Sequence, residues 1–221
     1  MAKGLKVLFK QLRQNHGIRL ITTFDDAIVP GSLVETRGWA DITPFSKLWT
    51  DPAITRADLG PVEGPTQVGL VDFSRKHELN LSSALDLIKP KAAAKAGFER
   101  AKEAVATFES PVAYGLDIVT VENAIEKDPE FWNRNLGSRL LLKNVRLVLR
   151  VYRARLSFFF KGSSGASVDV QATPAGNLTK AGLRGGWTWR NSATLETKKE
   201  ILVGVELYRY NKRKKRLVAK P

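Results

Sequence analysis

The stretch Val145-Arg-Leu-Val-Leu-Arg-Val-Tyr-Arg-Ala-Arg-Leu-Ser-Phe-Phe-Phe160 decides the fold expected for this chain. In its first half, apolar residues occupy every second position: Val145, Leu147, Leu149 and Val151. In its second half, they occupy the other parity: Tyr152, Ala154, Leu156 and Phe158. Alternation at a period of two is typical of a half-buried β-strand, and a single change of parity indicates a bulge. The sequence therefore predicts a long, bent strand with a bulge near Val151 or Tyr152.

Such a strand has an apolar face and a cationic face, which fits a half-buried sheet or the wall of a water-filled membrane barrel. From Phe131 to Val168 the chain carries eight Lys or Arg residues and no carboxylate. An arginine that faces lipid at the midplane of a barrel costs about 2–4 kcal/mol, so the arginines of this strand must face water or protein. A barrel also needs every strand edge paired, so a chain with few such strands closes one only when many copies join.

Composition limits the function classes. The 221 residues are 43% hydrophobic and 26% charged, which is ordinary for a globular protein with a substantial core. The net charge of +14 predicts attraction to nucleic acid phosphates or to an anionic lipid surface. The absence of cysteine excludes disulfides, thiolate metal sites and a cysteine nucleophile. His16 and His77 lack the spacing of metal ligands or of a triad, so we expect no enzyme, no catalytic residue, no metal and no cofactor.

The local patterns predict an α+β fold: a single domain with a twisted, mostly antiparallel sheet and peripheral helices. Helices are expected at residues 3–14, 91–108 and 123–132. Strands are expected at residues 18–24, 32–35, 112–121, about 140–161, 166–172 and 201–210, with one or two more within 68–87. Residues 37–49 are expected to form a loop rich in large aromatic side chains, and residues 51–69 to be irregular. The N-terminus lacks the apolar core of a signal peptide, and no stretch approaches the roughly 18 apolar residues of a helical span, so we expect a cytoplasmic protein.

Several features are typical of membrane contact. The expected N-terminal helix has an apolar stripe flanked by basic residues: Lys3, Lys6, Lys10 and Arg13. Trp39, Phe45 and Trp49 share one segment and could lie at the level of lipid headgroups. Core packing is the alternative interpretation for the helix, and a buried cluster that anchors the loop is the alternative for the aromatic residues.

Nucleic-acid binding is the second hypothesis, from a different class. Arginines beside Tyr152 and Phe158 could form a basic sheet with stacking rings: Arg146, Arg150, Arg153 and Arg155. Trp187 and Trp189, flanked by Arg184 and Arg190, could do the same, although sheet packing is the other interpretation of this pair. No recognition motif of a known nucleic-acid-binding fold is present.

The chain resembles the pore-forming domain of the gasdermins, especially their bacterial members. The N-terminal basic helix, the strand at 18–24 and Ile42-Thr-Pro-Phe-Ser-Lys-Leu-Trp49 resemble the opening of that domain. Gly176-Asn-Leu-Thr-Lys180 and Ile201-Leu-Val-Gly-Val-Glu-Leu-Tyr208 resemble its end. The order of the elements between them also fits, so the resemblance spans most of the chain, with residues 1–208 as the pore-forming domain.

The resemblance implies a cytoplasmic monomer that, once active, binds acidic phospholipid, forms a homo-oligomer and refolds into a β-barrel pore. In bacteria, the pore would permeabilise the inner membrane and kill the cell in antiphage defence. Carried onto this chain, the resemblance places lipid contacts at the four basic residues of the N-terminal helix and at Trp39 and Phe45. Two hairpins, from about 68–121 and about 140–173, would cross the membrane. The lipid-facing residues of the second would be Val145, Leu147, Leu149, Val151, Leu156, Phe158, Val168 and Val170.

Two departures concern regulation. The N-terminal cysteine that is lipid-modified in many bacterial relatives is missing. The basic residues 209–221 form either a final hairpin with a short return at 217–219 or the remnant of an inhibitory peptide. In the second case, a trypsin-like protease site would include Arg213, Lys215 and Arg216. An activating protease or a regulatory partner protein fits either interpretation.

Overall fold

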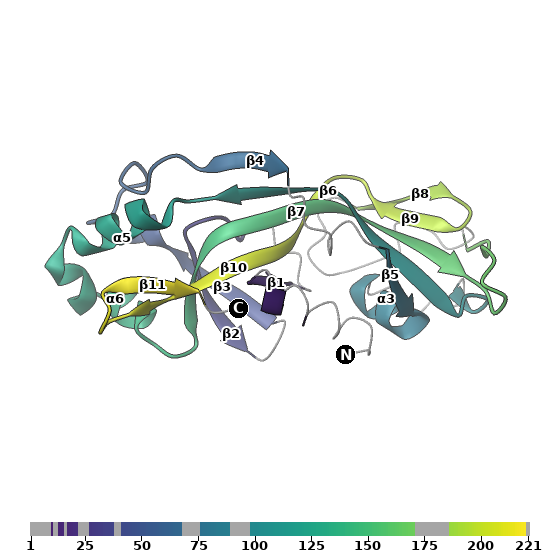
Figure 1. The fold of residues 1–221 in the computed structure, drawn as a ribbon, viewed down its shortest axis with the longest axis horizontal. Helices are drawn as coiled ribbons and strands as arrows, with labels where there is room; N and C mark the ends of the chain where they lie inside the picture. The colour runs from purple at the N-terminus through teal and green to yellow at the C-terminus, as the bar shows by residue number, and fades with distance from the viewer. Residues whose placement is uncertain are drawn as a thin grey trace. The chain divides into compact units, whose positions relative to one another are not determined.

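The computed structural model describes residues 10, 13–15, 17–21, 27–37, 41–67, 76–88, 98–170 and 186–219. Within them, most regular structure is β-strand, and a few short helices connect strands along the chain (Figure 1). The strands are β1 Ile18–Leu20, β2 Ser32–Arg37, β3 Asp41–Lys47, β4 Glu63–Gln67, β5 His77–Asn80, β6 Glu103–Gly115, β7 Val145–Lys161, β8 Trp187–Asn191, β9 Thr194–Thr197, β10 Ile201–Asn211 and β11 Arg216–Ala219. The α-helices are α3 Leu81–Ile88, α5 Ile118–Glu126 and α6 Asn135–Leu140, and the 3-10 helices are η1 Leu48–Thr50 and η3 Pro129–Asn133.

These strands form one sheet whose main order is β1-β10-β7-β2-β3. β6 also pairs with β7, and it carries β4 and β5 as further partners. β9 joins β7 to β8, and β11 pairs with β10. The described registers are antiparallel: those of β10 with β1 and β11, of β2 with β3 and β7, of β5 with β6, and of β9 with β7 and β8. The prediction of an α+β fold with a mostly antiparallel sheet is therefore confirmed.

The chain divides into two compact units. Unit 1 comprises Met1–Gln11, Gln67–Pro111 and Arg153–Leu202, and unit 2 comprises Leu12–Thr66, Val112–Tyr152 and Val203–Pro221. The three long strands β6, β7 and β10 each contribute residues to both units.

The core of unit 2 gathers apolar side chains from β2, β7, α5, η3 and the end of the chain. Its fully buried members include Leu33, Leu147, Val121 and Phe131. Tyr210 and Leu217, which lie opposite each other in β10 and β11, belong to the same cluster. The ring of Tyr210 lies 4.1 Å from that of Trp132, measured between centroids. The final hairpin is therefore packed into the core of unit 2.

The core of unit 1 is an aromatic cluster around the second half of β7. The ring of Phe160 lies 5.0 Å from Phe98 and 6.2 Å from Trp189, and the ring of Phe158 lies 5.8 Å from Trp187. Phe98, Phe158 and Phe160 are fully buried. Aromatic pairs at such separations add to the stability that their burial supplies. This cluster confirms sheet packing as the role of Trp187 and Trp189.

Strand β7 shows the predicted change of parity. Up to Val151 the odd-numbered apolar residues are buried, at no more than 3% exposure, and from Tyr152 the even-numbered ones are. Val148 is also fully buried, so this part of the strand is covered on both faces. The bulge itself stays a prediction.

The prediction of a loop at 37–49 is wrong, because residues 41–47 form strand β3. Pro44 within this segment indicated a loop, since proline donates no hydrogen bond to a sheet. In the structure β3 ends the main strand order, and Pro44 lies opposite Val34 where the register shifts. Edge strands and bulges are the places where a sheet tolerates proline.

The predicted helix at 91–108 is wrong over its second half, because β6 begins at Glu103 and runs to Gly115. Its alanines have high helix propensity, but Ala104 and Ala106 pair with Leu79 and His77 of β5 and are buried. Ser110, with φ of 48°, and Pro111 interrupt the pattern without ending the strand. Tertiary pairing thus overrides the local preference, while residues 91–97 lie outside the described part.

Other boundaries also differ from the prediction, and one strand, β4 at Glu63–Gln67, lies within the segment 51–69 that was expected to be irregular. The prediction of one or two strands within 68–87 is confirmed by β5 at His77–Asn80, and helix α3 follows directly at Leu81–Ile88. Residues 118–121 begin helix α5, because the Asp117 carboxylate accepts a hydrogen bond from the backbone N–H of Thr120 and caps the helix. The expected return strand at 166–172 is reduced, over 166–170, to one bridge between Lys161 and Ser167, although the turn at 162–165 is present.

Candidate functional site

The residues proposed to face lipid are stored inside the two cores. Val145, Leu147, Leu149 and Val151 are buried in unit 2. In unit 1, Leu156, Phe158 and Val170 are buried, while Val168 is half-buried. Burying one such side chain is worth about 1.5–3 kcal/mol, so these residues leave their cores only if another apolar environment receives them.

Arg150 of β7 has a specific carboxylate partner. The guanidinium of Arg150 lies 3.5 Å from the Glu206 carboxylate of β10. The same carboxylate accepts a short hydrogen bond from the hydroxyl of Tyr152 and a 3.4 Å bond from that of Tyr208. Burial, followed by the hydrogen bond to Glu206, raises the pKa of Tyr152 above its ordinary value. Burial and the charge of Glu206 also raise the pKa of Tyr208. Glu206 therefore compensates a cation and holds two phenols in the neutral form.

A second carboxylate has a similar role in unit 1. Glu109 of β6 accepts hydrogen bonds of 2.9 and 2.7 Å from Arg190 and one of 3.3 Å from Ser157 of β7. Arg190 also pairs with Glu196. Sequence reasoning missed both Glu109 and Glu206, because only their positions in strands neighbouring β7 relate them to its cationic face.

The tip of the final hairpin is strongly basic. Residues 212–215 form the turn between β10 and β11, and Arg213, Lys215 and Arg216 are exposed. The hairpin is anchored where the Tyr210 hydroxyl donates a 3.0 Å hydrogen bond to Glu126, and where the backbone N–H of Leu217 donates to Glu122. The basic tip is thus part of a final hairpin, and cleavage at its basic residues stays a prediction.

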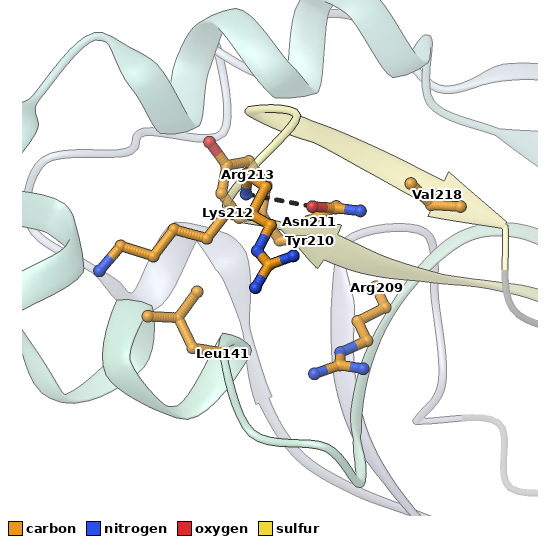
Figure 2. Close-up of a pocket in the computed structure, with 7 residues that line it drawn as sticks. All are labelled: Leu141, Arg209, Tyr210, Asn211, Lys212, Arg213 and Val218. Atoms are coloured by element: carbon orange, nitrogen blue, oxygen red, sulfur yellow. Dashed lines mark hydrogen bonds between the residues drawn. The ribbon is translucent and has the colours of Figure 1, made fainter.

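A pocket of about 400 Å³ lies at this hairpin (Figure 2). Its lining includes the cations Arg209, Lys212 and Arg213 and the apolar residues Leu141 and Val218. Figure 2 shows the side chains of Arg209 and Arg213 extending to the same side of the hairpin. The nearby Arg146 is half-buried, and burial together with the charge of Arg209 lowers the pKa of Arg146.

The proposed lipid contacts are only partly described. Lys3, Lys6 and Trp39 lie outside the described residues. Lys10 is helical and exposed, and Arg13 belongs to a helical turn that Gly17 closes with φ of 68° and an N–H bond to the carbonyl of Arg13. The ring of Phe45 lies 3.9 Å below the guanidinium of Arg139, which also pairs with Glu35 at 2.9 Å. Phe45 is thus a strand residue with one ring face covered, and it does not lie in a loop.

The rings proposed to stack on nucleic acid bases are mostly inaccessible. Tyr152 and Phe158 are 4% and 0% exposed, and Trp187 is 3% exposed. Arg150 and Arg155 remain exposed, so a cationic surface persists without the aromatic platform that base stacking requires.

We also searched the described part of the chain for metal sites and for membrane-spanning helices. It contains no group of three or more His, Asp or Glu residues that could hold a metal ion. Among its helices, none has both the length and the apolarity to cross a membrane.

Comparison with known proteins identifies the architecture. No family model and no curated protein sequence matches the chain. Its structure is similar to that of a bacterial gasdermin from Bradyrhizobium tropiciagri, with a TM-score of 0.60 at 14% sequence identity. The similarity covers 97% of this chain and 90% of that one. The chain therefore has a gasdermin-like fold, as the resemblance in its sequence implied.

Proposed function

We propose that this protein is a gasdermin-like, pore-forming effector of cell death. The observation that carries the proposal is a gasdermin-like fold over nearly the whole chain, built around a 17-residue strand with opposed apolar and cationic residues. A membrane-crossing strand needs about 9–11 residues, so β7 exceeds the required length.

In the proposed mechanism, the inactive monomer resides in the cytoplasm and the active form assembles on the inner membrane. Acidic phospholipid attracts the cationic chain, and the N-terminal basic helix makes the first contacts. Copies then associate, and the segments 68–121 and 140–173 refold into membrane hairpins. Killing the host cell in this way would serve antiphage defence.

The polar partners of β7 account for a conditional transition. The hydrogen bonds to Glu206 and Glu109 hold β7 in its sheet. Exposing its buried apolar side chains to water would be unfavourable, so β7 stays in the sheet while the protein is in water. In an oligomeric barrel the apolar side chains would meet lipid, while the arginines would face the water-filled interior. The free-energy cost of removing the apolar side chains from the core is therefore offset only when a membrane and further copies are both present.

Vesicle leakage tests the proposal. The purified chain, intact or treated with trypsin, is added to dye-filled vesicles of phosphatidylcholine with or without 30% phosphatidylglycerol. We expect release from the acidic vesicles, with ring-shaped assemblies in electron micrographs, and little release from the neutral ones. If both forms of the protein leave acidic vesicles sealed and no rings form, the proposal is wrong.

Substitutions then test the hairpin and the helix. Val168→Asp places a charge on a proposed lipid-facing residue that is only half-buried in the sheet, so the monomer should fold and the leakage should fall. Leu147 and Leu149 are unsuitable for this purpose, because they are buried in the core and an aspartate there would unfold the monomer. Charge reversal at Lys6 and Lys10 should weaken release by reducing attraction to anionic lipid.

A further inference from the structure

The pocket at the final hairpin is a cationic cavity without a compensating carboxylate in its lining. Arg209, Lys212 and Arg213 contribute three positive charges, while its remaining residues are neutral. Its volume of about 400 Å³ lies within the range of pockets that hold small molecules. A concave surface that concentrates one sign of charge raises the local concentration of counter-ions of the other sign.

Arg209 supplies the more specific observation. Its Nε atom is buried and has no hydrogen-bond acceptor among the described residues. Burial, and then the charge of Arg209, lowers the pKa of Arg146, so the two guanidinium groups disfavour each other. Arg146 directs one nitrogen to the backbone carbonyls of Lys143 and Val145, each at 2.7 Å. A guanidinium that has no acceptor at Nε and lies near a second cation leaves positive charge uncompensated, and an anion in the pocket would offset that charge.

The cations are held on a defined framework. Asn211 Oδ1 accepts hydrogen bonds from the backbone N–H groups of Arg213 and Lys214, at 3.1 and 3.2 Å, which shapes the turn (Figure 2). Arg209 lies opposite Val218 in the β10–β11 ladder. Because these elements are fixed in the sheet and by Tyr210 in the core, the site loses little entropy on binding.

We infer that this pocket binds the phosphate group of a small phosphorylated ligand. Arginine presents a planar fork of donors that matches phosphate oxygens, and Lys212 adds a point charge. The same chemistry is offered by a free phosphate ester and by the headgroup of an acidic lipid. The site is inferred from the folded monomer, so it does not depend on pore formation.

Binding is measured by calorimetry in low salt with glycerol 3-phosphate, and by co-sedimentation with phosphatidylcholine vesicles containing 20% phosphatidic acid. Arg209→Gln and Arg213→Gln are compared with Lys214→Gln, which removes the same charge from the same turn outside the pocket lining. Each pocket variant should weaken glycerol 3-phosphate binding about tenfold, because a lost charge-assisted hydrogen bond is worth at least that factor. Lys214→Gln should change it less than about twofold.

The outcomes separate the sources of phosphate. Binding of glycerol 3-phosphate that depends on Arg209 and Arg213 supports the pocket, and a parallel loss in the vesicle arm identifies the lipid headgroup as a ligand. Retained vesicle binding by both variants would assign the pocket to free phosphate esters. If glycerol 3-phosphate does not bind, or if the three variants lose affinity equally, the inference is wrong. If only a 20-nucleotide oligonucleotide binds, and all three substitutions and added salt weaken that binding equally, the hairpin is a general polyanion-binding surface and not a phosphate pocket. Arg213 is exposed, so its variant remains informative should Arg209→Gln fail to fold.

Discussion

The hydroxyl of Tyr152 on β7 donates a hydrogen bond to the Glu206 carboxylate on β10, and Arg150 pairs with the same carboxylate. Tyr152 is 4% exposed, so its hydroxyl group depends on Glu206 rather than on water as its acceptor. The polar contact therefore holds together two neighbouring strands of the sheet in unit 2.

Glu206→Ala should lower the free energy of unfolding by about 1–3 kcal/mol, because it removes the acceptor of a buried hydroxyl and the partner of Arg150. Urea denaturation measures the loss, and Glu103→Ala at an exposed position of β6 is the control, expected within about 0.5 kcal/mol of the parent. Equal losses in the two variants would contradict the role assigned to Glu206.

The buried phenols predict a loss of stability at alkaline pH. The pKa values of Tyr152, Tyr208 and Tyr210 are all raised, by burial first and then by Glu206 or Glu126. Folding thus favours the protonated phenols, so their contribution is complete below the unfolded value of about 10 and falls as the pH rises above it. Denaturation between pH 8 and pH 11.5 should show this decline, and Tyr152→Phe should flatten it. An unchanged slope in Tyr152→Phe would show that Tyr152 is not responsible.

Asp58 predicts a loss of stability at acidic pH. Hydrogen bonds from Thr55, then from Lys127, lower the pKa of Asp58 from 3.8 to about 2. Its contribution is present above pH 3.8 and is lost as the pH falls towards 2. Asp58→Asn should remove part of the pH dependence in that window, followed by denaturation between pH 6 and pH 2. Lys127→Met should retain most of it, because the hydrogen bond from Thr55 is the larger cause; the reverse order would contradict the assignment.

Gly31 is required by both conformation and space. Its φ is 90°, and a Cβ atom there would lie 2.5 Å from Cζ3 of Trp49. Gly165, with φ of 77° and no atom within 4 Å of such a Cβ, offers a matched control. Gly165→Ala should cost about 1 kcal/mol from backbone strain, and Gly31→Ala should cost clearly more, as measured by urea unfolding. Similar losses would show that the Trp49 ring moves away without cost.

A removable crosslink tests the proposed departure of β7 from its sheet. Ser157 lies opposite Glu196 in β7 and β9, a position where Cα atoms are about 4.5–5.5 Å apart and suit a disulfide. The chain has no cysteine, so Ser157→Cys/Glu196→Cys forms one defined bond. The oxidised variant should release no dye, and reduction should restore release.

The control crosslink joins strands that the proposal leaves paired. Glu35→Cys/Thr43→Cys connects β2 to β3, outside both proposed membrane hairpins, and should release dye whether oxidised or reduced. If the oxidised Ser157→Cys/Glu196→Cys variant is as active as its reduced form, β7 does not separate from β9 during pore formation.

The parts of the fold that sequence predicts are those with an unambiguous local pattern. The parity of apolar residues in β7 determines which side chains are buried on each side of Val151, and the basic turn after Tyr210 separates two strands of a hairpin. The first part of β6 and the whole of β3 could not be predicted, because alanine, Ser110-Pro111 and Pro44 disfavour strands locally and only pairing with β5 and β2 overrides them.

The candidate site divides in the same way. Its cations are evident from composition, whereas their partners Glu206 and Glu109 lie 56 and 81 positions away from Arg150 and Arg190. Such distant pairs depend on strand register, which a single sequence does not specify. That Arg209 Nε has no acceptor among the described residues likewise becomes evident only when the surrounding atoms are placed.

Because Trp187 packs against Phe158, the intrinsic fluorescence of Trp187 reports on the position of this part of β7. An indole in a dry aromatic environment emits at shorter wavelength than one in contact with water. Departure of the second half of β7 would therefore change the emission wavelength of Trp187, which can be followed in real time without an attached dye. Removing Trp187 alone would show how much of that signal originates beside Phe158.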